Sequence, residues 1–587
     1  MLLEGVPASS GIQIGTALLF HREDFDVPTY TIDESEIEKE IKKFESALIQ
    51  TRKELEEIQS KIQKEMSSIH AGIFSAHILL LEDPMFVDEV KKEITISKLN
   101  SAAAVKNVVQ NIIDQFSTMD NEYLRGREAD IRDVVSRLIQ NILGKEKIDL
   151  SSLKKEVIVI SHDLSPSDTA LMNKDKVIGF ATDVGSKTSH TAIMARALEI
   201  PAVVGLGKIT SYVKTGDLVI IDGNRGRVLI NPDGEVYEEY LIEQSKFQEF
   251  EQSLSMLKDM PAVTLDGTHI ELACNIEVPE ELSSIQKYGA KGIGLYRTEY
   301  IFIRKRTELP SEEEQYESYK EAVEKVAPEA VIIRTLDLGG DKFASSLGIP
   351  ADVGSMMGLR AIRLCLQYPF IFMPQLRAIL RASAYGNAKI MFPMISRVEE
   401  LRLAKVMLDQ AKSELEYEGL PFDPNIEIGT MIEVPSAVVT ADILAKECDF
   451  FSIGTNDLIQ YTLAVHRVNE EIAHLYEPLN PAILRLIKQV IDIAHENGIW
   501  VGICGEMASD PLVVPLLIGM GVDELSMSPI AVPEVKKIIR SLTVEEAQKI
   551  TQVAMSFSTA NEIESYVYSE AMERFPDVLM WIDHRLH

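Results

Sequence analysis

The arrangement of apolar and polar residues changes several times along the chain. Residues 11–20 form an apolar run bounded by glycine, which predicts a β-strand. From about residue 33 to residue 144, apolar residues recur at helical spacing in a charged background, and proline is nearly absent. This segment predicts about four helices packed as a bundle. Its exposed faces are either a docking surface for a partner protein or simply solvated.

Strand patterns return after the helical segment. Five short apolar runs, several of them separated by glycine turns, cover residues 157–160, 176–182, 202–204, 218–223 and 227–230. Together with the first strand they predict one small α/β domain. We expect this domain to comprise residues 1–20 and 148–230, interrupted by a helical insertion at residues 21–147.

A polar, helix-favouring stretch at residues 231–260 predicts a connecting helix. Strand, loop and helix patterns then alternate eight times within residues 261–560. The predicted strands are residues 269–273, 292–296, 331–334, 389–393, 427–432, 450–454, 500–503 and 524–527. Eight strands alternating with helices over about 280 residues are typical of a (β/α)8 barrel. The chain is therefore predicted to be a multidomain α/β protein that ends in a TIM-type barrel.

Composition indicates a soluble protein of several domains, because 587 residues exceed the size of one hydrophobic core. No apolar run is long enough to span a bilayer, and the first residues do not resemble a secretory signal. We therefore expect a cytoplasmic protein without membrane insertion, and the scattered spacing of the four cysteines fits a reducing compartment. The net charge of −32 argues against a nucleic acid partner. An anionic substrate would need a locally basic pocket.

One histidine stands in a setting suited to phosphoryl chemistry. His190 lies within residues 185–196, between an apolar strand pattern and a helical pattern. Glycine and small hydroxylated residues let the backbone approach a ligand, and the N-terminus of a helix favours an anion. The imidazole could therefore carry a phosphoryl group. A structural histidine hydrogen-bonded at a turn fits the local sequence equally well.

Polar residues collect at the predicted carboxyl ends of the barrel strands, where such barrels carry out their chemistry. Arginines there have planar groups that suit a phosphate and a carboxylate, which indicates a small phosphorylated acid as substrate. The arginines concerned are Arg297, Arg334, Arg360 and Arg467. Each of them could instead form a structural salt bridge.

Two carboxylates and a thiol complete this set of polar residues. Glu433 and Asp457 follow successive predicted strands, and two carboxylates with substrate oxygens and water are a usual way to hold Mg²⁺. Cys504 stands at another strand end, from which its thiol could deliver a proton. The alternatives are helix caps for the carboxylates and a small core residue for the cysteine. These residues indicate a function only when they are taken together.

Three stretches carry a resemblance to a known family, namely residues 185–196, 294–299 and 449–467. With them the chain resembles Enzyme I of the bacterial phosphotransferase system, the phosphoenolpyruvate-protein phosphotransferases, over about residues 1–560. The wider family includes pyruvate phosphate dikinase and phosphoenolpyruvate synthase, which also carry a large ATP-binding domain. This chain has neither room for that domain nor a glycine-rich nucleotide loop.

The resemblance implies that phosphoenolpyruvate phosphorylates His190, which passes the phosphoryl group to a histidine of the carrier protein HPr as the first step of sugar uptake. Pyruvate is released, and Cys504 would protonate the enolate carbon. Glu433 and Asp457 would hold Mg²⁺. The remaining assignments are substrate binding by Arg297, Arg334, Asn456, Asp457 and Arg467, added charge from Arg360, and hydrogen-bond support of the nucleophile by Thr188.

The same resemblance implies a role for each part of the chain. Residues 1–20 and 148–230 would form a swivelling phosphohistidine domain, and the inserted helices at residues 21–147 would bind HPr. The barrel at residues 261–560 would bind phosphoenolpyruvate and mediate a homodimer. Residues 561–587 form a tail that is longer than expected for the family, and no role follows for it.

Four places depart from the pattern of the family. Ser186 replaces a usual glycine or alanine, and residues 352–360 lack the Asn-Pro that usually precedes the glycine and arginine. His466 stands where an acidic residue is common, and Val468 replaces a usual glycine. These changes keep a second hypothesis open, a regulatory protein that senses phosphoenolpyruvate or carrier phosphorylation and turns over poorly. Steady pyruvate release in the presence of HPr would favour the enzyme.

Overall fold

The structure is a computed structural model of the chain. It describes all residues except 21–26, 66–76, 79, 118–127, 145–149, 151–152, 166–167, 170–171, 174, 187–188, 305–307, 340–356, 468, 470 and 583–587. The chain divides into two compact units, Met1–Glu249 with Trp581–His587, and Phe250–Met580. The boundary falls within the long helix α9 (Gly234–Met256).

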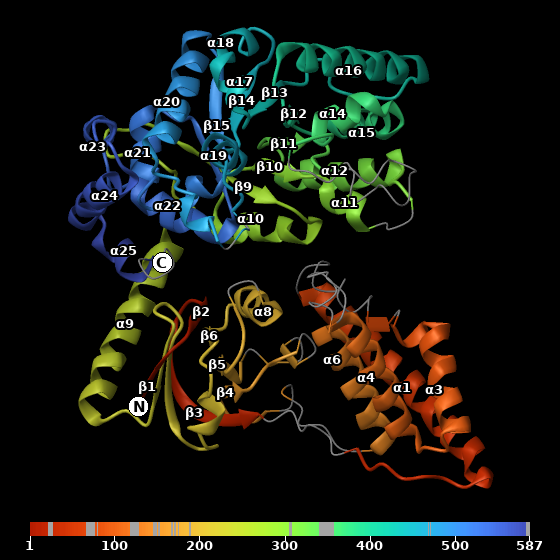
Figure 1. The fold of residues 1–587 in the computed structure, drawn as a ribbon. Helices are drawn as coiled ribbons and strands as arrows, with labels where there is room; N and C mark the ends of the chain where they lie inside the picture. Colours follow the sequence, from red (N-terminus) through yellow and green to blue (C-terminus); the bar gives the residue numbers. More distant parts are fainter. Residues whose placement is uncertain are drawn as a thin grey trace. The chain divides into compact units, whose positions relative to one another are not determined.

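An eight-stranded sheet forms the α/β part of the first unit, in the order β1-β8-β7-β3-β4-β5-β6-β2 (Figure 1). Its strands are β1 (Leu2–Glu4), β2 (Val6–Ser9), β3 (Ile12–Phe20), β4 (Val157–Ser161), β5 (Val177–Thr182), β6 (Ala202–Val204), β7 (Leu218–Asp222) and β8 (Arg227–Ile230). Because β3 pairs with β4 in parallel and with β7 in antiparallel fashion, the start of the chain completes a sheet formed by later strands. The sequence patterns missed β1 and β2, which are too short to show an alternation.

The described part of the helical insertion contains four long helices, α1 (Ile37–Glu65), α3 (Pro84–Ile96), α4 (Ser101–Ser117) and α6 (Glu128–Leu143). Their apolar faces meet in one core that includes the fully buried side chains of Phe44, Val90 and Leu138. Glu40 of α1 is buried as well and accepts hydrogen bonds from the backbone and the hydroxyl of Ser101 at the start of α4. The predicted bundle is thereby confirmed for the described helices.

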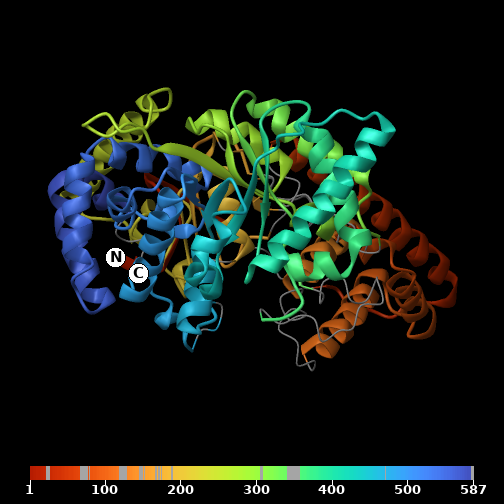
Figure 2. The same cartoon turned by 90° about the horizontal axis from the view of Figure 1, so that it is seen from above.

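Eight parallel strands of the second unit close into a barrel, because β16 pairs with β9 (Figure 2). The strands are β9 (Glu271–Ile276), β10 (Ile293–Arg297), β11 (Val331–Arg334), β12 (Ala388–Phe392), β13 (Ile428–Ile432), β14 (Phe450–Ile453), β15 (Trp500–Ile503) and β16 (Glu524–Met527). Every predicted barrel strand overlaps one of these strands, so the predicted TIM-type barrel is confirmed. Their apolar side chains fill the interior, as Leu295, Ile332 and Phe450 do.

Helices follow the barrel strands along the chain (Figure 1). They are α10 (Leu282–Tyr288), α11 (Glu299–Arg304), α12 (Glu312–Val326), α14 (Ala361–Gln367), α15 (Pro369–Ser383), α16 (Val398–Glu418), α17 (Pro435–Val439), α18 (Ala441–Leu444), α19 (Thr455–Leu463), α20 (Pro481–Glu496), α21 (Val514–Met520) and α22 (Val532–Ile539). Beyond the barrel lie α23 (Val544–Ala554), α24 (Ala560–Arg574) and α25 (Pro576–Ile582), so the described part of the tail is helical. None of the described helices has the length and apolar character needed to cross a membrane.

A buried carboxyl group lies at the amino end of the barrel strands. Glu524 begins β16 and is 7% exposed. Glycines leave the space that it occupies, since a Cβ atom would lie 2.5 Å from its Oε1 at Gly294 and 3.1 Å away at Gly502. Burial and the nearby carboxylate of Glu271 raise the pKa of Glu524 to about 7, against the smaller lowering effect of Lys389. This part of the barrel therefore favours a neutral carboxyl group.

Replacing this group with a neutral amide, Glu524→Gln, should stabilise the protein more at high pH than at low pH. Because the pKa of Glu524 is higher in the folded state than in the unfolded chain, stability falls as the pH rises from about 4 to about 7. The loss reaches up to about 3 kcal/mol, and glutamine avoids it. Thermal unfolding at pH 5 and pH 8 measures the effect, and the variant should gain in Tm relative to wild type at pH 8. An equal difference at both pH values would contradict the prediction.

Candidate active site at the mouth of the barrel

The barrel brings the predicted site residues of the second unit to one rim. Arg297 and Arg334 end β10 and β11, and the other residues follow the carboxyl ends of their strands directly or within a few residues. The others are Glu433 after β13, Asn456 and Asp457 after β14, and Cys504 after β15. In a parallel barrel these ends meet at the same mouth. The structure therefore gathers residues that are far apart in the sequence.

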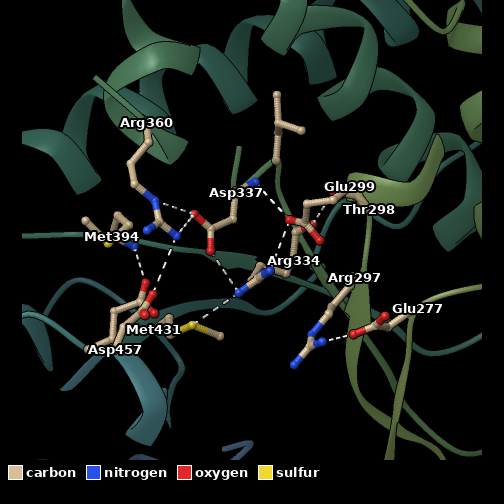
Figure 3. Close-up of polar contacts among 12 residues, drawn as sticks. Glu277, Arg297, Thr298, Glu299, Arg334, Asp337, Arg360, Met394, Met431 and Asp457 are labelled. Carbon is tan, nitrogen blue, oxygen red and sulfur yellow. Dashed lines mark hydrogen bonds and ion pairs between the residues drawn. The ribbon is translucent and has the colours of Figure 1, made fainter. Parts of the chain in front are cut away.

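The centre of the mouth is a carboxylate that bridges two arginines (Figure 3). Asp337 Oδ2 lies 3.0 Å from Nη1 of Arg334, while its Oδ1 accepts hydrogen bonds from Nη2 and Nε of Arg360 at 2.7 Å and 3.1 Å. Glu299 Oε1 accepts from Nη2 of Arg334 at 3.1 Å and from the Asp337 backbone N–H at 2.9 Å. The two guanidinium groups are thus held in fixed positions.

The charged forms of Arg334, Arg360 and Asp337 favour one another. Burial alone would lower the pKa of Arg334 and of Arg360, but the facing carboxylates raise both pKa values. For Asp337, burial would raise the pKa, and the two arginines lower it below its usual range. Asp337 and Glu299 balance the charges of Arg334 and Arg360, so an anionic ligand would share these guanidinium groups with the two carboxylates.

Arg297 adds a third cation on the neighbouring strand. It forms an ion pair with Glu277, which follows β9 directly (Figure 3). Burial, and to a lesser degree the nearby Arg334, lower the pKa of Arg297. The sequence analysis passed over Glu277, although its place at a strand end was an available signal. An anion bound here would relieve the repulsion between the arginines.

A fourth arginine lies on the more exposed side of the mouth. Arg467 Nη1 is 2.7 Å from Oε1 of Glu506, and the same oxygen accepts a hydrogen bond from Nδ2 of Asn456 at 3.2 Å. The Glu506 backbone N–H donates in turn to Asn456 Oδ1 at 3.1 Å. Glu506 thus connects two residues that the sequence analysis assigned to substrate binding.

Two acidic side chains form the candidate metal site. Glu433 is 2% exposed, and its Oε1 accepts a hydrogen bond from the backbone N–H of Met394 at 2.6 Å. Met394 has a φ of 58°, a strained value for this residue type that is often found at functional sites. Burial and the carboxylates of Asp337 and Asp457 raise the pKa of Glu433 well above its usual range.

The donor set fits a magnesium ion that also takes oxygens from substrate and water. Glu433 and Asp457 supply carboxylate oxygens, which Mg²⁺ prefers, and a cation would relieve their mutual repulsion. Among the described residues, no group of three or more His, Cys, Asp or Glu side chains has the arrangement of a metal site.

Cys504 supplies a protonated thiol. The residue is 4% exposed, its Sγ donates to the carbonyl oxygen of Ile453 at 3.7 Å, and burial raises its pKa to about 11. The next residue must be glycine, because a Cβ atom on Gly505 would lie 1.8 Å from Oγ1 of Thr455. This close approach fixes the loop of Cys504 against the loop that carries Asn456.

The candidate nucleophile belongs to the first unit. His190 is the first residue of α8 (His190–Leu198), and the N-cap residue Ser189 accepts a hydrogen bond from the backbone N–H of Ala192 at 3.3 Å. The predicted strand-to-helix turn is therefore present between β5 and α8. Only the backbone of His190 is described, and Thr188 lies outside the described residues. Their roles stay predictions.

The structure places some of the residues that depart from the family pattern. Arg360 lies at the centre of the mouth as the N-cap residue of α14, even though the preceding segment lacks the family's usual residues. Residues 352–356 and Val468 lie outside the described residues. His466 is exposed, and its carbonyl oxygen accepts a backbone hydrogen bond from Asn469.

The thiol of Cys504 should react slowly with iodoacetamide at neutral pH. Only the thiolate is nucleophilic, and a pKa of about 11 leaves very little of it at pH 7.5. Mass spectrometry of peptides from the folded protein should show little Cys504 labelling at pH 7.5 and increasing labelling toward pH 10. Rapid labelling of Cys504 at pH 7.5, with Tm unchanged, would show that the thiol is exposed or already ionised.

Three family models match the chain. Residues 251–544 match the PEP-binding domain of PEP-utilising enzymes, residues 4–127 match their N-terminal domain, and residues 153–226 match their mobile domain. The matches cover both units of the structure. The first of them contains the barrel and every residue of the mouth described above.

Relatives are similar to the chain over nearly its whole length. A phosphoenolpyruvate-protein phosphotransferase of Staphylococcus carnosus is 45% identical over 561 residues, which is 96% of this chain and 97% of the relative. The protein of the same name from Geobacillus stearothermophilus is 45% identical over 565 residues, with the same coverage of both chains. One from Staphylococcus aureus is 44% identical over 566 residues, 96% of this chain and 98% of the relative.

Proposed function

The chain belongs to the phosphoenolpyruvate-protein phosphotransferases, the Enzyme I family, and from this premise we propose the roles of its residues. It is a phosphoenolpyruvate-dependent phosphotransferase of the bacterial phosphotransferase system, as the resemblance in its sequence predicted. The observation that carries the residue roles is the barrel mouth, where arginines, carboxylates and a protonated thiol lie together.

The substrate carries a phosphate and a carboxylate, and both suit the planar guanidinium groups of the mouth. We assign its binding to Arg297, Arg334, Arg360, Asn456, Asp457 and Arg467. Burial and the nearby Arg334 lower the pKa of Arg297, and a bound anion would offset the effect of Arg334, which supports this assignment. The carboxylates of Glu277 and Glu506 now pair with two of the arginines, so the substrate would compete with them.

The proposed transfer breaks the phosphorus–oxygen bond of phosphoenolpyruvate and forms a phosphorus–nitrogen bond with the imidazole of His190. The arginines stabilise the charge of the phosphoryl group during transfer. Free N–H groups at the start of α8 favour the same group once it is on the histidine, and Thr188 would add a hydrogen bond. His190 and the barrel belong to different units, and the proposal includes the swivelling movement of the histidine domain that the family resemblance implies.

The enolate that leaves must gain a proton on its terminal carbon to become pyruvate. Cys504 is the proposed donor, because its thiol keeps the proton at neutral pH. The resulting thiolate recovers a proton from solvent before the next cycle. In the reverse direction, the thiolate would remove the same proton from pyruvate.

Mg²⁺ is the proposed cofactor, with Glu433 and Asp457 as its protein ligands. When bound, it would neutralise charge on the phosphate and carboxylate of the substrate. The raised pKa of Glu433 supports this assignment, because a neighbouring cation favours the ionised carboxylate.

The proposed acceptor of the phosphoryl group is a histidine of HPr, which would bind the helices of residues 21–147. We further propose that residues 1–20 and 148–230 act as the phosphohistidine domain, and that residues 231–260 connect it to the barrel. The barrel, residues 261–560, would form a homodimer. The cytoplasmic location expected from the sequence stays a prediction.

Incubation with phosphoenolpyruvate and Mg²⁺ should add one phosphoryl group to the protein, and HPr should then remove it. Intact-mass spectrometry before and after addition of HPr measures both steps, and peptide mapping should place the group on His190. The variant His190→Ala should gain no mass, because it lacks the accepting nitrogen.

Binding of phosphoenolpyruvate provides the control for this experiment. Calorimetry should show that His190→Ala still binds the substrate, since the arginines of the barrel are unchanged. Phosphorylation of that variant on another residue would contradict the assignment of the nucleophile. Wild-type protein that binds the substrate without gaining mass would instead support the sensor hypothesis.

Cys504→Ala should slow pyruvate formation by about 10²-fold or more, which is the usual effect of losing a general acid. The binding of phosphoenolpyruvate should change little, because no arginine of the mouth has Cys504 as a hydrogen-bond partner. A lactate dehydrogenase-coupled assay measures the rate, and calorimetry measures the binding.

Cys448→Ala is a matched control, since Cys448 is also buried and its Sγ also donates to a backbone carbonyl, that of Leu444. It should leave the rate near that of wild type. An unchanged rate in Cys504→Ala would remove this thiol from the mechanism. Equal losses in both variants would point to a general effect of cavities in the barrel.

A further inference from the structure

Asp337 lies between the arginines of the mouth and the two carboxylates of the candidate metal site. We propose that Asp337 is a positioning residue that holds Arg360 away from Asp457 and thereby keeps the carboxylates of Asp457 and Glu433 available to a divalent cation. The inference rests on the proposed function, in which these two carboxylates bind Mg²⁺.

One nitrogen atom of Arg360 is shared unequally between two carboxylates (Figure 3). Its Nη2 is 2.7 Å from Oδ1 of Asp337 and 3.5 Å from Oδ2 of Asp457. The Nε of Arg360 adds a second hydrogen bond to Asp337 at 3.1 Å. Asp337 is therefore the principal partner of Arg360, and Asp457 is a second and more distant carboxylate partner.

Burial makes this competition strong. The side chains of Asp337, Arg360 and Asp457 are only 4%, 14% and 18% exposed, so water cannot easily replace a missing partner. A guanidinium group that loses one buried carboxylate keeps its charge, and pairing with another carboxylate then lowers its free energy. Without the charge of Asp337, Arg360 would turn to Asp457 and form a closer ion pair with it.

Arg334, the other arginine that pairs with Asp337, would not need a new partner. Arg334 keeps Glu299 as a partner at 3.1 Å when Asp337 is neutralised. One oxygen of Asp457 is already engaged, since Oδ1 accepts a hydrogen bond from Nε2 of Gln460 at 2.8 Å. Closer pairing of Arg360 with Oδ2 would therefore leave both oxygens of Asp457 firmly engaged and less available to a metal.

The test uses Mn²⁺ as the probe, because its binding can be followed by electron paramagnetic resonance without any turnover. Asp337→Asn keeps the shape of the side chain and removes its charge. This variant should bind Mn²⁺ about tenfold more weakly than wild type, the effect expected when a residue behind a metal ligand is lost. Circular dichroism and Tm confirm that each variant is folded.

A second substitution separates positioning from a general structural role. Adding Arg360→Gln to Asp337→Asn removes the arginine that captures Asp457, so Mn²⁺ affinity should return to near the wild-type value. Arg360→Gln alone should raise the affinity much less, because Asp337 already holds this arginine away. A second lesion would not restore an affinity lost through misfolding.

Three outcomes would overturn the inference. Equal Mn²⁺ affinity in wild type and Asp337→Asn would show that Asp337 does not protect the site. The same conclusion would follow if the double variant did not recover Mn²⁺ affinity. It would also follow if Arg360→Gln alone raised Mn²⁺ affinity tenfold. If Glu433→Gln binds Mn²⁺ as tightly as wild type, the proposed metal ligands are themselves wrong. That last result identifies failure of the proposed function, whereas the others leave it standing.

Discussion

The mouth of the barrel depends on the requirement that a buried charge has a partner. Arg334, Asp337 and Arg360 are all largely buried, and leaving any of them without a partner of opposite charge would be costly. Their ion pairs fix the two guanidinium groups before any ligand arrives. Preformed positions of this kind lower the cost of reorganisation when a phosphoryl group moves. Within a protein of net charge −32, these ion pairs hold the guanidinium groups of the mouth in fixed positions, each beside a carboxylate.

Closure of the barrel is what makes this network possible. Arg297 and Arg334 end adjacent strands, while Cys504 follows a strand from a distant part of the sequence. A register shift of one residue would turn these side chains from the mouth toward another surface. The apolar interior formed by residues such as Ile332 and Phe450 fixes that register. The closed barrel of the second unit therefore serves the site directly, whereas the candidate nucleophile belongs to the other unit.

Much of this arrangement could be predicted from the sequence, because its signals are local. Short apolar runs between helical patterns identify the barrel strands, and the residue at each strand end identifies the mouth. The pairing of the charges could not be predicted, because it depends on side-chain distances between strands. The shared role of Asp337 and the link that Glu506 makes between Arg467 and Asn456 are examples. The short strands β1 and β2 were missed because three or four residues carry no clear alternation.

The mouth contains two kinds of repulsion between like charges, one between arginines and one between carboxylates, and one combination of ligands would relieve both. Burial is the main cause of both pKa shifts, but Arg334 also lowers the pKa of Arg297, and the carboxylates of Asp337 and Asp457 also raise the pKa of Glu433. An anion alone would relieve the first repulsion and worsen the second, and a cation alone would do the reverse. A substrate with phosphate and carboxylate groups that binds together with Mg²⁺ relieves both. In the proposed mechanism, the neighbouring arginines and carboxylates of the mouth would thus favour the joint binding of substrate and metal over the binding of either one alone.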